Sequence, residues 1–191
     1  GTNFTNSLLV GTSSTGTLND ANSNTGVGIG VLAALTSGDR NTVVGFQAGK
    51  DNTTGGENSF FGRLAGCENT TGGANTGIGS ASINSNTTGG CNTAIGHSAL
   101  ETNTTASNNV AVGYRAAGSN TTGAENTAVG TCALLANTTG ANNVGIGERA
   151  ICTNTTGNCN VSVGYKALGA NTTASQNVAV GSCALLANTT G

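Results

Sequence analysis

The sequence predicts an all-β chain that winds into a parallel β-solenoid of eleven turns, each 17 residues long. Two observations carry this expectation: a repeat that recurs without insertion or deletion, and a composition rich in Gly, Asn and Thr. Pro, Met and Trp are absent, and aromatic and charged residues make up 3% and 7% of the 191 residues. Such a chain cannot fill the broad core of an ordinary enzyme domain, but it can fill a narrow interior in which backbones approach closely.

The repeat defines a frame in which position 1 is Asn in ten of eleven copies and position 5 is Gly in all eleven. Position 4 is always Val, Ile or Phe. Repeats with a fixed period of this length are typical of solenoids, because each turn buries its apolar residues against its neighbours. We therefore treat residues 7–191 as one solenoid, and residues 1–6 as a segment that caps the stack or pairs with another subunit. The repeats start at Ser7, Asn24, Asn41, Asn58, Asn75, Asn92, Asn109, Asn126, Asn143, Asn160 and Asn177.

Each repeat has room for two short strands. The first covers positions 2 to 4, where alternation places the side chains of positions 2 and 4 on one face and that of position 3 on the other. The Gly of position 5 then turns the corner, where the backbone needs a positive φ or has no space for a side chain. A second strand is expected around positions 8 to 10, as in Ala184-Leu185-Leu186. Turns stacked about 4.8 Å apart would then share a thin core roughly 50 Å long.

The Asn of position 1 is expected to form a ladder. Identical amide side chains stacked at the spacing of neighbouring strands can donate and accept hydrogen bonds up and down the stack. We expect a structural role for these residues and no chemistry.

Several repeats resemble a known family of surface proteins. The segments "NVAVGYRAA", "NTAVGTCAL", "NVSVGYKAL" and "NVAVGSCAL" look like the head repeats of trimeric autotransporter adhesins and of related NTAVG-repeat fibre proteins, including phage tail fibres. The resemblance covers about nine positions of each repeat in residues 41–191. It implies a left-handed β-roll that associates in threes. The unit of this chain departs from the adhesin pattern because it is longer, with an added N-T-T-G segment.

The N-T-T segment, at positions 12 to 14, has three interpretations. It can be a turn in which Asn and Thr side chains bond the local backbone. It also fits the N-x-T acceptor of N-linked glycans, and nine copies on the segment most exposed to solvent strengthen that interpretation. A ladder of Thr hydroxyls could instead bind ice, although alternation leaves one Thr per turn on any face. The candidate glycosylation sites are Asn52, Asn69, Asn86, Asn103, Asn120, Asn137, Asn154, Asn171 and Asn188.

Six cysteines are distributed over three repeat positions. Cys152 and Cys159 occupy positions 10 and 17 of one repeat, and Cys67 and Cys91 occupy the same positions in consecutive repeats. A disulfide across the base of the loop is predicted for both pairs, provided that the Cα atoms come within about 7 Å. Cys132 and Cys183 share position 7 three turns apart, too far for a bond within one chain, so they are candidates for links between subunits. These placements favour an oxidising, extracellular setting.

Several function classes are disfavoured by the sequence. The net charge is −2 and no basic patch or long apolar run occurs, which argues against nucleic-acid binding and membrane insertion. With one histidine, no C-x-x-C and no paired carboxylates at a repeated position, we expect no metal site, no cofactor and no enzymatic activity.

The sequence therefore predicts the structural subunit of an extracellular or cell-surface fibre. Its partners would be copies of itself, in a trimer or a head-to-tail fibril, and its N-T-T loops would carry glycans. The main alternative is an adhesin, or a phage-type receptor-binding fibre, that grips a host surface through a bare ladder face.

Overall fold

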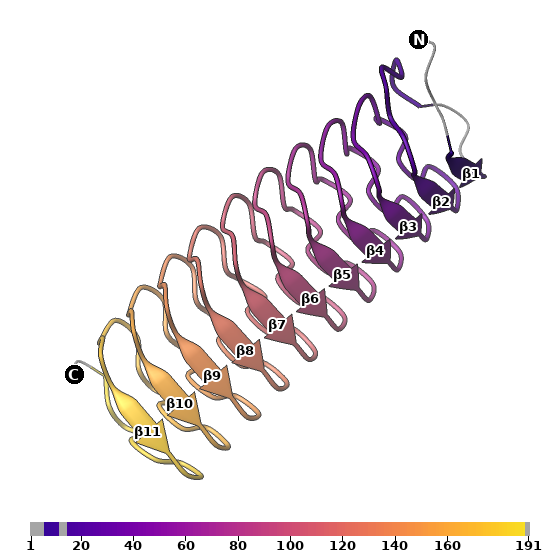
Figure 1. The fold of residues 1–191 in the computed structure, drawn as a ribbon. Helices are drawn as coiled ribbons and strands as arrows, with labels where there is room; N and C mark the ends of the chain where they lie inside the picture. The colour runs from indigo at the N-terminus through magenta and orange to yellow at the C-terminus, as the bar shows by residue number, and fades with distance from the viewer. Residues whose placement is uncertain (1–5, 12–14, 190–191) are drawn as a thin grey trace.

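The described part of the chain folds into a straight rod of about ten stacked turns that follow the 17-residue repeat (Figure 1). The structure is a computed structural model that describes residues 6–11 and 15–189. In this part of the chain, eleven strands form one parallel sheet in chain order. The strands are β1 Leu8–Val10, β2 Thr25–Val27, β3 Thr42–Val44, β4 Ser59–Phe61, β5 Thr76–Ile78, β6 Thr93–Ile95, β7 Val110–Val112, β8 Thr127–Val129, β9 Val144–Ile146, β10 Val161–Val163 and β11 Val178–Val180.

The predicted solenoid and its first strand are confirmed. Each strand covers positions 2 to 4 and pairs with the same positions of the next turn, as in Val161 opposite Val178 and Val163 opposite Val180. The central residue of each strand points inward, and in β2 to β11 it is buried. The side chains of positions 2 and 4 point outward, where they stay partly or largely exposed.

The Gly of position 5 makes the corner, as predicted. Its φ lies between 126° and 144° in the ten repeats that follow the first. A Cβ on Gly113 would lie 2.7 Å from the carbonyl oxygen of Gly130 in the next turn. Both the backbone conformation and the close approach of successive turns therefore require glycine.

The predicted second strand at positions 8 to 10 is wrong. This wall of the rod consists of turns, because the residues at positions 7 and 9 adopt a positive φ, for example 52° at Lys166 and 49° at Leu168. The wall is still hydrogen-bonded from turn to turn: the N–H of Gly49 donates to the carbonyl oxygen of Ala65 at 2.9 Å. Alternating left-handed residues prevent an extended strand but leave these bonds intact.

The core is thin and is packed by pairs of complementary size. Position 3 of the strand faces position 9 of the opposite wall, so a large residue at one requires a small residue at the other. Phe60 at position 3 is completely buried against Gly66, where a Cβ would lie 2.5 Å from the ring. In the next turn the order is reversed, because Gly77 at position 3 faces the buried Ile83 at position 9.

Some predictions fall outside this description. Residues 1–5, which make up most of the predicted capping segment, lie outside the described residues, and Asn6 is exposed. The left-handed sense of the coil and its assembly in threes stay predictions. No helix among the described residues is long and apolar enough to cross a membrane.

Replacing Gly113 by Ala should lower the free energy of unfolding by about 2–4 kcal/mol, because Ala must adopt a positive φ against the Gly130 carbonyl. The matched control is Gly90→Ala at position 16, where the φ is not positive and where other repeats carry Ala124 and Ala141. Equilibrium denaturation should show a large loss for the first variant and a change below about 1 kcal/mol for the second. Equal losses would contradict the role assigned to position 5.

Candidate functional surfaces

The Asn residues of position 1 form the predicted ladder inside the rod. The Oδ1 of Asn24 accepts hydrogen bonds from the backbone N–H and from the Nδ2 of Asn41, both at 3.0 Å. The Oδ1 of Asn41 accepts the backbone N–H of Asn58 in the same way, and the pattern continues to Asn177. In the first repeat the hydroxyl of Ser7 replaces the amide and accepts the N–H of Asn24 at 2.9 Å.

The Asn residues of position 12, the first residue of N-T-T, form a second ladder. The Nδ2 of Asn69 donates to the Oδ1 of Asn52 at 2.8 Å, and each following Asn donates to the one before it as far as Asn171. Eight of these residues have no exposed surface: Asn52, Asn69, Asn86, Asn103, Asn120, Asn137, Asn154 and Asn171.

The two ladders meet at the carbonyl group of position 15. The oxygen of Gly72 accepts the Nδ2 of Asn58, at position 1, and the Nδ2 of Asn69, at position 12, both at 2.9 Å. Gly55 is held in the same way by Asn41 and Asn52. Each clamp connects the start of the strand to both limbs of the loop. We call this arrangement the asparagine clamp.

N-linked glycans at these eight residues stay a prediction, and the burial of the eight side chains argues against it. The nitrogen that would carry the sugar is fully buried in all eight residues. In the seven residues from Asn69 to Asn171 both of its hydrogens are donated, one to the preceding Asn and one to the position-15 carbonyl, whereas Asn52 donates to the Gly55 carbonyl alone. A glycan would remove a donor and needs space that the packed ladder does not have. Asn188 is partly buried, and its sequon includes Thr190, which lies outside the described residues.

The two threonines of N-T-T have different environments. The hydroxyl of the first, at position 13, donates to the backbone of the next turn, as Thr53 does to the Thr70 carbonyl at 3.0 Å. The second, at position 14, is exposed at the tip of the loop. One row of hydroxyls therefore faces solvent, as alternation predicted. We call this row the threonine ridge: Thr54, Thr71, Thr88, Thr105, Thr122, Thr139, Thr156 and Thr173.

The predicted disulfides are absent, and all six cysteines are free thiols. Cys152, at position 10, belongs to the wall opposite the sheet, whereas Cys159, at position 17, directly precedes β10 and is exposed. Cys67 is buried and Cys91 is exposed at the corresponding positions. The asparagine clamp lies between these two walls, so the base of the loop is not a narrow neck that a disulfide could bridge.

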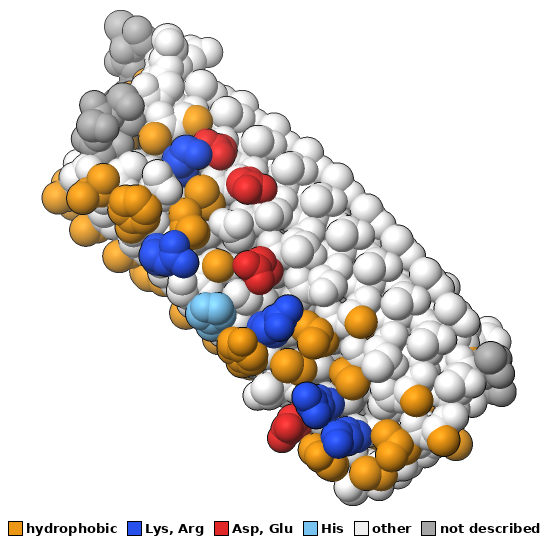
Figure 2. Space-filling model, turned by 180° about the vertical axis from the view of Figure 1, so that it is seen from behind, with side chains coloured by type: hydrophobic (Ala, Val, Ile, Leu, Met, Phe, Trp, Pro, Cys, Tyr) orange, Lys and Arg blue, Asp and Glu red, His pale blue; other side chains and the backbone are white. Residues whose placement is uncertain are grey.

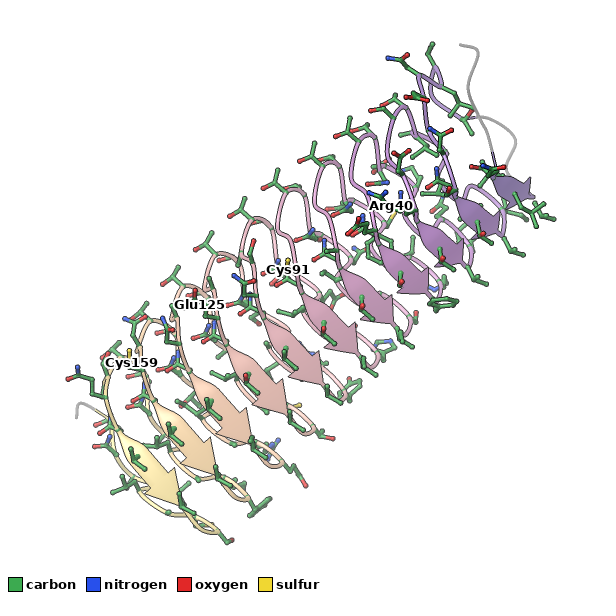
Figure 3. The ribbon with its side chains drawn as sticks, in the orientation of Figure 1. Arg40, Cys91, Glu125 and Cys159 are labelled. Atoms are coloured by element: carbon green, nitrogen blue, oxygen red, sulfur yellow. The ribbon has the colours of Figure 1, made fainter. Side chains whose placement is uncertain are left out.

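The remaining charged and sulfur-bearing side chains lie in rows along the rod. Position 17 contributes Arg40, Cys91, Glu125 and Cys159, which follow one line parallel to the axis (Figure 3). In this row Arg40 forms an exposed ion pair with Glu57 at 2.9 Å, a contact of small energetic value. Cys132 and Cys183, the proposed links between subunits, are partly exposed and exposed. No group of three or more potential metal ligands occurs in the part of the chain that the structure describes.

The sequence did not reveal which face of each strand is buried. Position 4 is always apolar, yet it points outward, and the smaller residue at position 3 fills the core. The small size of most position-3 residues was the available signal, because a narrow interior accepts Gly and Ala more readily than Val or Ile. The outer face of the sheet therefore carries a row of apolar side chains at position 4.

Replacing Asn120 by Ala should destabilise the rod by about 3–5 kcal/mol, because it removes three buried hydrogen bonds, to Asn103, Gly123 and Asn137. The control is Thr122→Ala on the threonine ridge, which also destroys the sequon at Asn120 but should change stability by less than about 0.5 kcal/mol. Chemical denaturation and intact-mass measurements should be made on both variants. If Thr122→Ala is lighter than the unmodified protein by the mass of one glycan, Asn120 carries a sugar, and this result would contradict the clamp.

Alkylation of the denatured, unreduced protein should modify six thiols. In the folded protein Cys91, Cys159 and Cys183 should react first and Cys67 last. Burial raises the pKa of the Cys67 thiol, so the reactive thiolate is scarcer there at any given pH. Rates at each cysteine can be followed by peptide mass mapping over a range of pH. Fewer than six reactive thiols before reduction would mean that the protein contains a disulfide.

Comparisons of this chain with family models, with curated proteins and with solved structures found no match. The resemblance to adhesin head repeats therefore stays a prediction.

Proposed function

We propose that this chain is the structural subunit of an extracellular or cell-surface fibre, a rod that associates side by side with copies of itself. The observation that carries the proposal is the apolar outer face of the sheet. The fold is compatible with such a role, because hydrogen-bonded ladders that run the whole length of the rod resist bending and local opening.

The outer face consists of positions 2 and 4 of all eleven strands. Neither row contains a charged residue. Position 4 consists of Val, Ile and Phe, whereas position 2 carries five Thr, one Ser, four Val and one Leu. Away from the ends of the rod, the Phe and Ile side chains of position 4 keep about two fifths of their surface exposed: 39% at Phe61, 42% at Ile78 and 40% at Ile146. The smaller side chains of the same row are half-buried: Val44, Val112, Val129 and Val163. The row of position 4 is therefore apolar along the length of the rod, and no charged residue interrupts the outer face.

The size of this face is sufficient for association. Eleven strands about 4.8 Å apart, each about three residues wide, cover roughly 500 Å². This area includes the Thr and Ser side chains of position 2 and is comparable to the largest apolar patch of a typical monomeric protein, which is often a functional surface. Two of these faces in contact would bury about 1,000 Å², which is near the lower limit for a specific interface.

The chemistry of the face favours a second copy as the partner. A partner selected by charge has nothing to bind, because neither row offers an ionised group. A second copy presents rows of the same β-branched side chains at the same spacing, so the two faces can interdigitate along their whole length. A closed assembly of two or three rods and an open fibril both satisfy this matching.

Adhesion is the second candidate function. Burial of the sequon asparagines leaves the threonine ridge bare, and a bare ridge of regularly spaced hydroxyls is what a surface-gripping fibre would present. Ice binding is less well supported, because a single row of hydroxyls on a loop tip offers a ridge and no flat lattice.

Sedimentation velocity tests the proposal. The unmodified protein should sediment at a small multiple of 18.4 kDa or larger. The double variant Ile78→Lys with Ile146→Lys, which places two charges on the outer face, should sediment as a folded monomer. The matched control is Thr88→Lys with Thr156→Lys, on the threonine ridge and in the same repeats, which should leave the assembly unchanged.

A monomeric unmodified protein at micromolar concentration would overturn the proposal. Loss of assembly in the ridge variant alone would assign the contact to the loops, and specific binding of a surface ligand abolished by the ridge variant would favour adhesion.

A further inference from the structure

A shallow groove of about 760 Å³ runs along the wall opposite the sheet, over the last four turns. It is lined by residues of positions 7, 10 and 11. The rows at positions 7 and 10 lie side by side, because a Cβ on Gly169 would be 3.6 Å from the Cβ of Lys166 in the same turn. Position 7 thus forms one side of the groove, and positions 10 and 11 form its floor. A volume of this size is typical of small-molecule sites.

The floor of the groove carries no charged side chain in this part of the rod and is apolar except for Thr153. Position 10 carries Leu135, Cys152, Gly169 and Leu186 here. The absence of a side chain at Gly169 leaves a hollow, into which the Leu186 side chain leans, since its Cδ1 would lie 2.9 Å from a Cβ at that position. In the earlier turns positions 10 and 11 carry charged residues: Lys50, Asp51, Glu68 and Glu101.

The charges at the groove have one sign. Arg149 and Lys166 line its side, and neither forms an ion pair among the described residues, where the ion pairs are Arg40 with Glu57 and Lys50 with Asp51. The Lys166 ammonium lies 5.1 Å from the centre of the Tyr165 ring.

The other ionisable groups do not cancel these two charges. Glu148 is the one acidic residue in these four turns, and it does not line the groove. Burial raises the pKa of the Cys152 thiol, so that thiol is neutral at pH 7. Figure 2 shows Lys and Arg side chains among hydrophobic ones along this edge of the rod, beside a broad uncharged area.

We propose that this groove binds a medium-chain carboxylate, that is, a free fatty acid. The acyl chain would lie along positions 10 and 11, and the carboxylate would meet Arg149 and Lys166. Two unpaired cations beside an apolar floor complement an anionic amphiphile, because the tail removes apolar surface from water while the head group receives charge-assisted hydrogen bonds. The four turns span about 14 Å, and Arg149 and Lys166 lie in the two middle turns, so the acyl chain would run along the floor from the middle of the groove toward one of its ends. The proposal does not depend on association of the rods, because the groove lies on the wall opposite the outer face.

Isothermal titration calorimetry with dodecanoate, below the concentration at which it forms micelles, tests the binding. Dodecanoate should bind with 1:1 stoichiometry, and dodecanol and dodecyltrimethylammonium should bind at least about tenfold more weakly. The double variant Arg149→Gln with Lys166→Gln should lose about tenfold or more in affinity for dodecanoate. The control, Arg63→Gln with Arg115→Gln, changes the net charge equally at exposed arginines that do not line the groove and should retain the affinity.

Thiol protection locates the ligand. Cys132 and Cys152 line the groove, whereas Cys91 and Cys159 are exposed in the row at position 17. Dodecanoate should slow the reaction of methyl methanethiosulfonate with the first pair and leave the second pair unchanged, as measured by peptide mass mapping.

Three results would overturn the proposal: no binding of dodecanoate, equal binding of the three head groups, or equal protection of all four cysteines. If dodecanoate does not bind and the Arg149 and Lys166 variant breaks an assembly in sedimentation velocity, the groove belongs instead to a contact with a second copy.

Discussion

The asparagine clamp is the interaction on which the rest of this structure depends. In seven of the turns two buried amides bond one carbonyl oxygen, as Asn58 and Asn69 do at Gly72, and the Asn side chains also bond their counterparts in a neighbouring turn. The turn of Asn109 is an exception, because the buried Nδ2 of Asn109 has no hydrogen-bond partner and Gly123 is bonded by Asn120 alone. A buried amide without partners costs about 1–3 kcal/mol, so neither Asn can be lost alone. The clamp fixes the two limbs of the loop relative to the strand, and it sets the same spacing in every turn.

That fixed spacing explains the rest of the composition. Turns held so close together leave no room for a side chain at the corner, and the φ of Gly113 is 132° where the next turn approaches. The interior that remains is narrow, and Phe60 fits inside it only because the residue that faces it, Gly66, has no side chain. Because the narrow interior has little space for further apolar side chains, the larger Val and Ile side chains of position 4 point outward. An apolar outer face is thus a consequence of a polar, hydrogen-bonded interior.

Much of this fold was predictable from the period and from residue type. The 17-residue repeat, the strand at positions 2 to 4, the corner glycine and the ladder of position 1 all follow from local rules. The second strand failed because the sequence does not reveal that Lys166 and Leu168 adopt a positive φ, a conformation imposed by bonds to neighbouring turns. The burial of the sequon asparagines was missed for a related reason: Asn120 recurs as regularly as Asn126, which indicated a second ladder, but its sequon favoured exposure. The groove depends on Gly169 and Leu186 in adjacent turns, a juxtaposition that a single repeat does not contain.

Hydrogen exchange of the asparagine side-chain amides, measured by nitrogen-15 NMR on the native protein, tests the clamp most directly. Burial and donated hydrogen bonds predict slow exchange at Asn residues of both ladders, such as Asn120, whose Nδ2 donates two bonds, and Asn126, whose Nδ2 donates one. The exposed amides of Asn108 and Asn142, at position 17, should exchange at the rate of free asparagine. Slow exchange at position 1 and fast exchange at position 12 would contradict the clamp and would mean that the Asn side chains of the N-T-T segment are exposed to solvent.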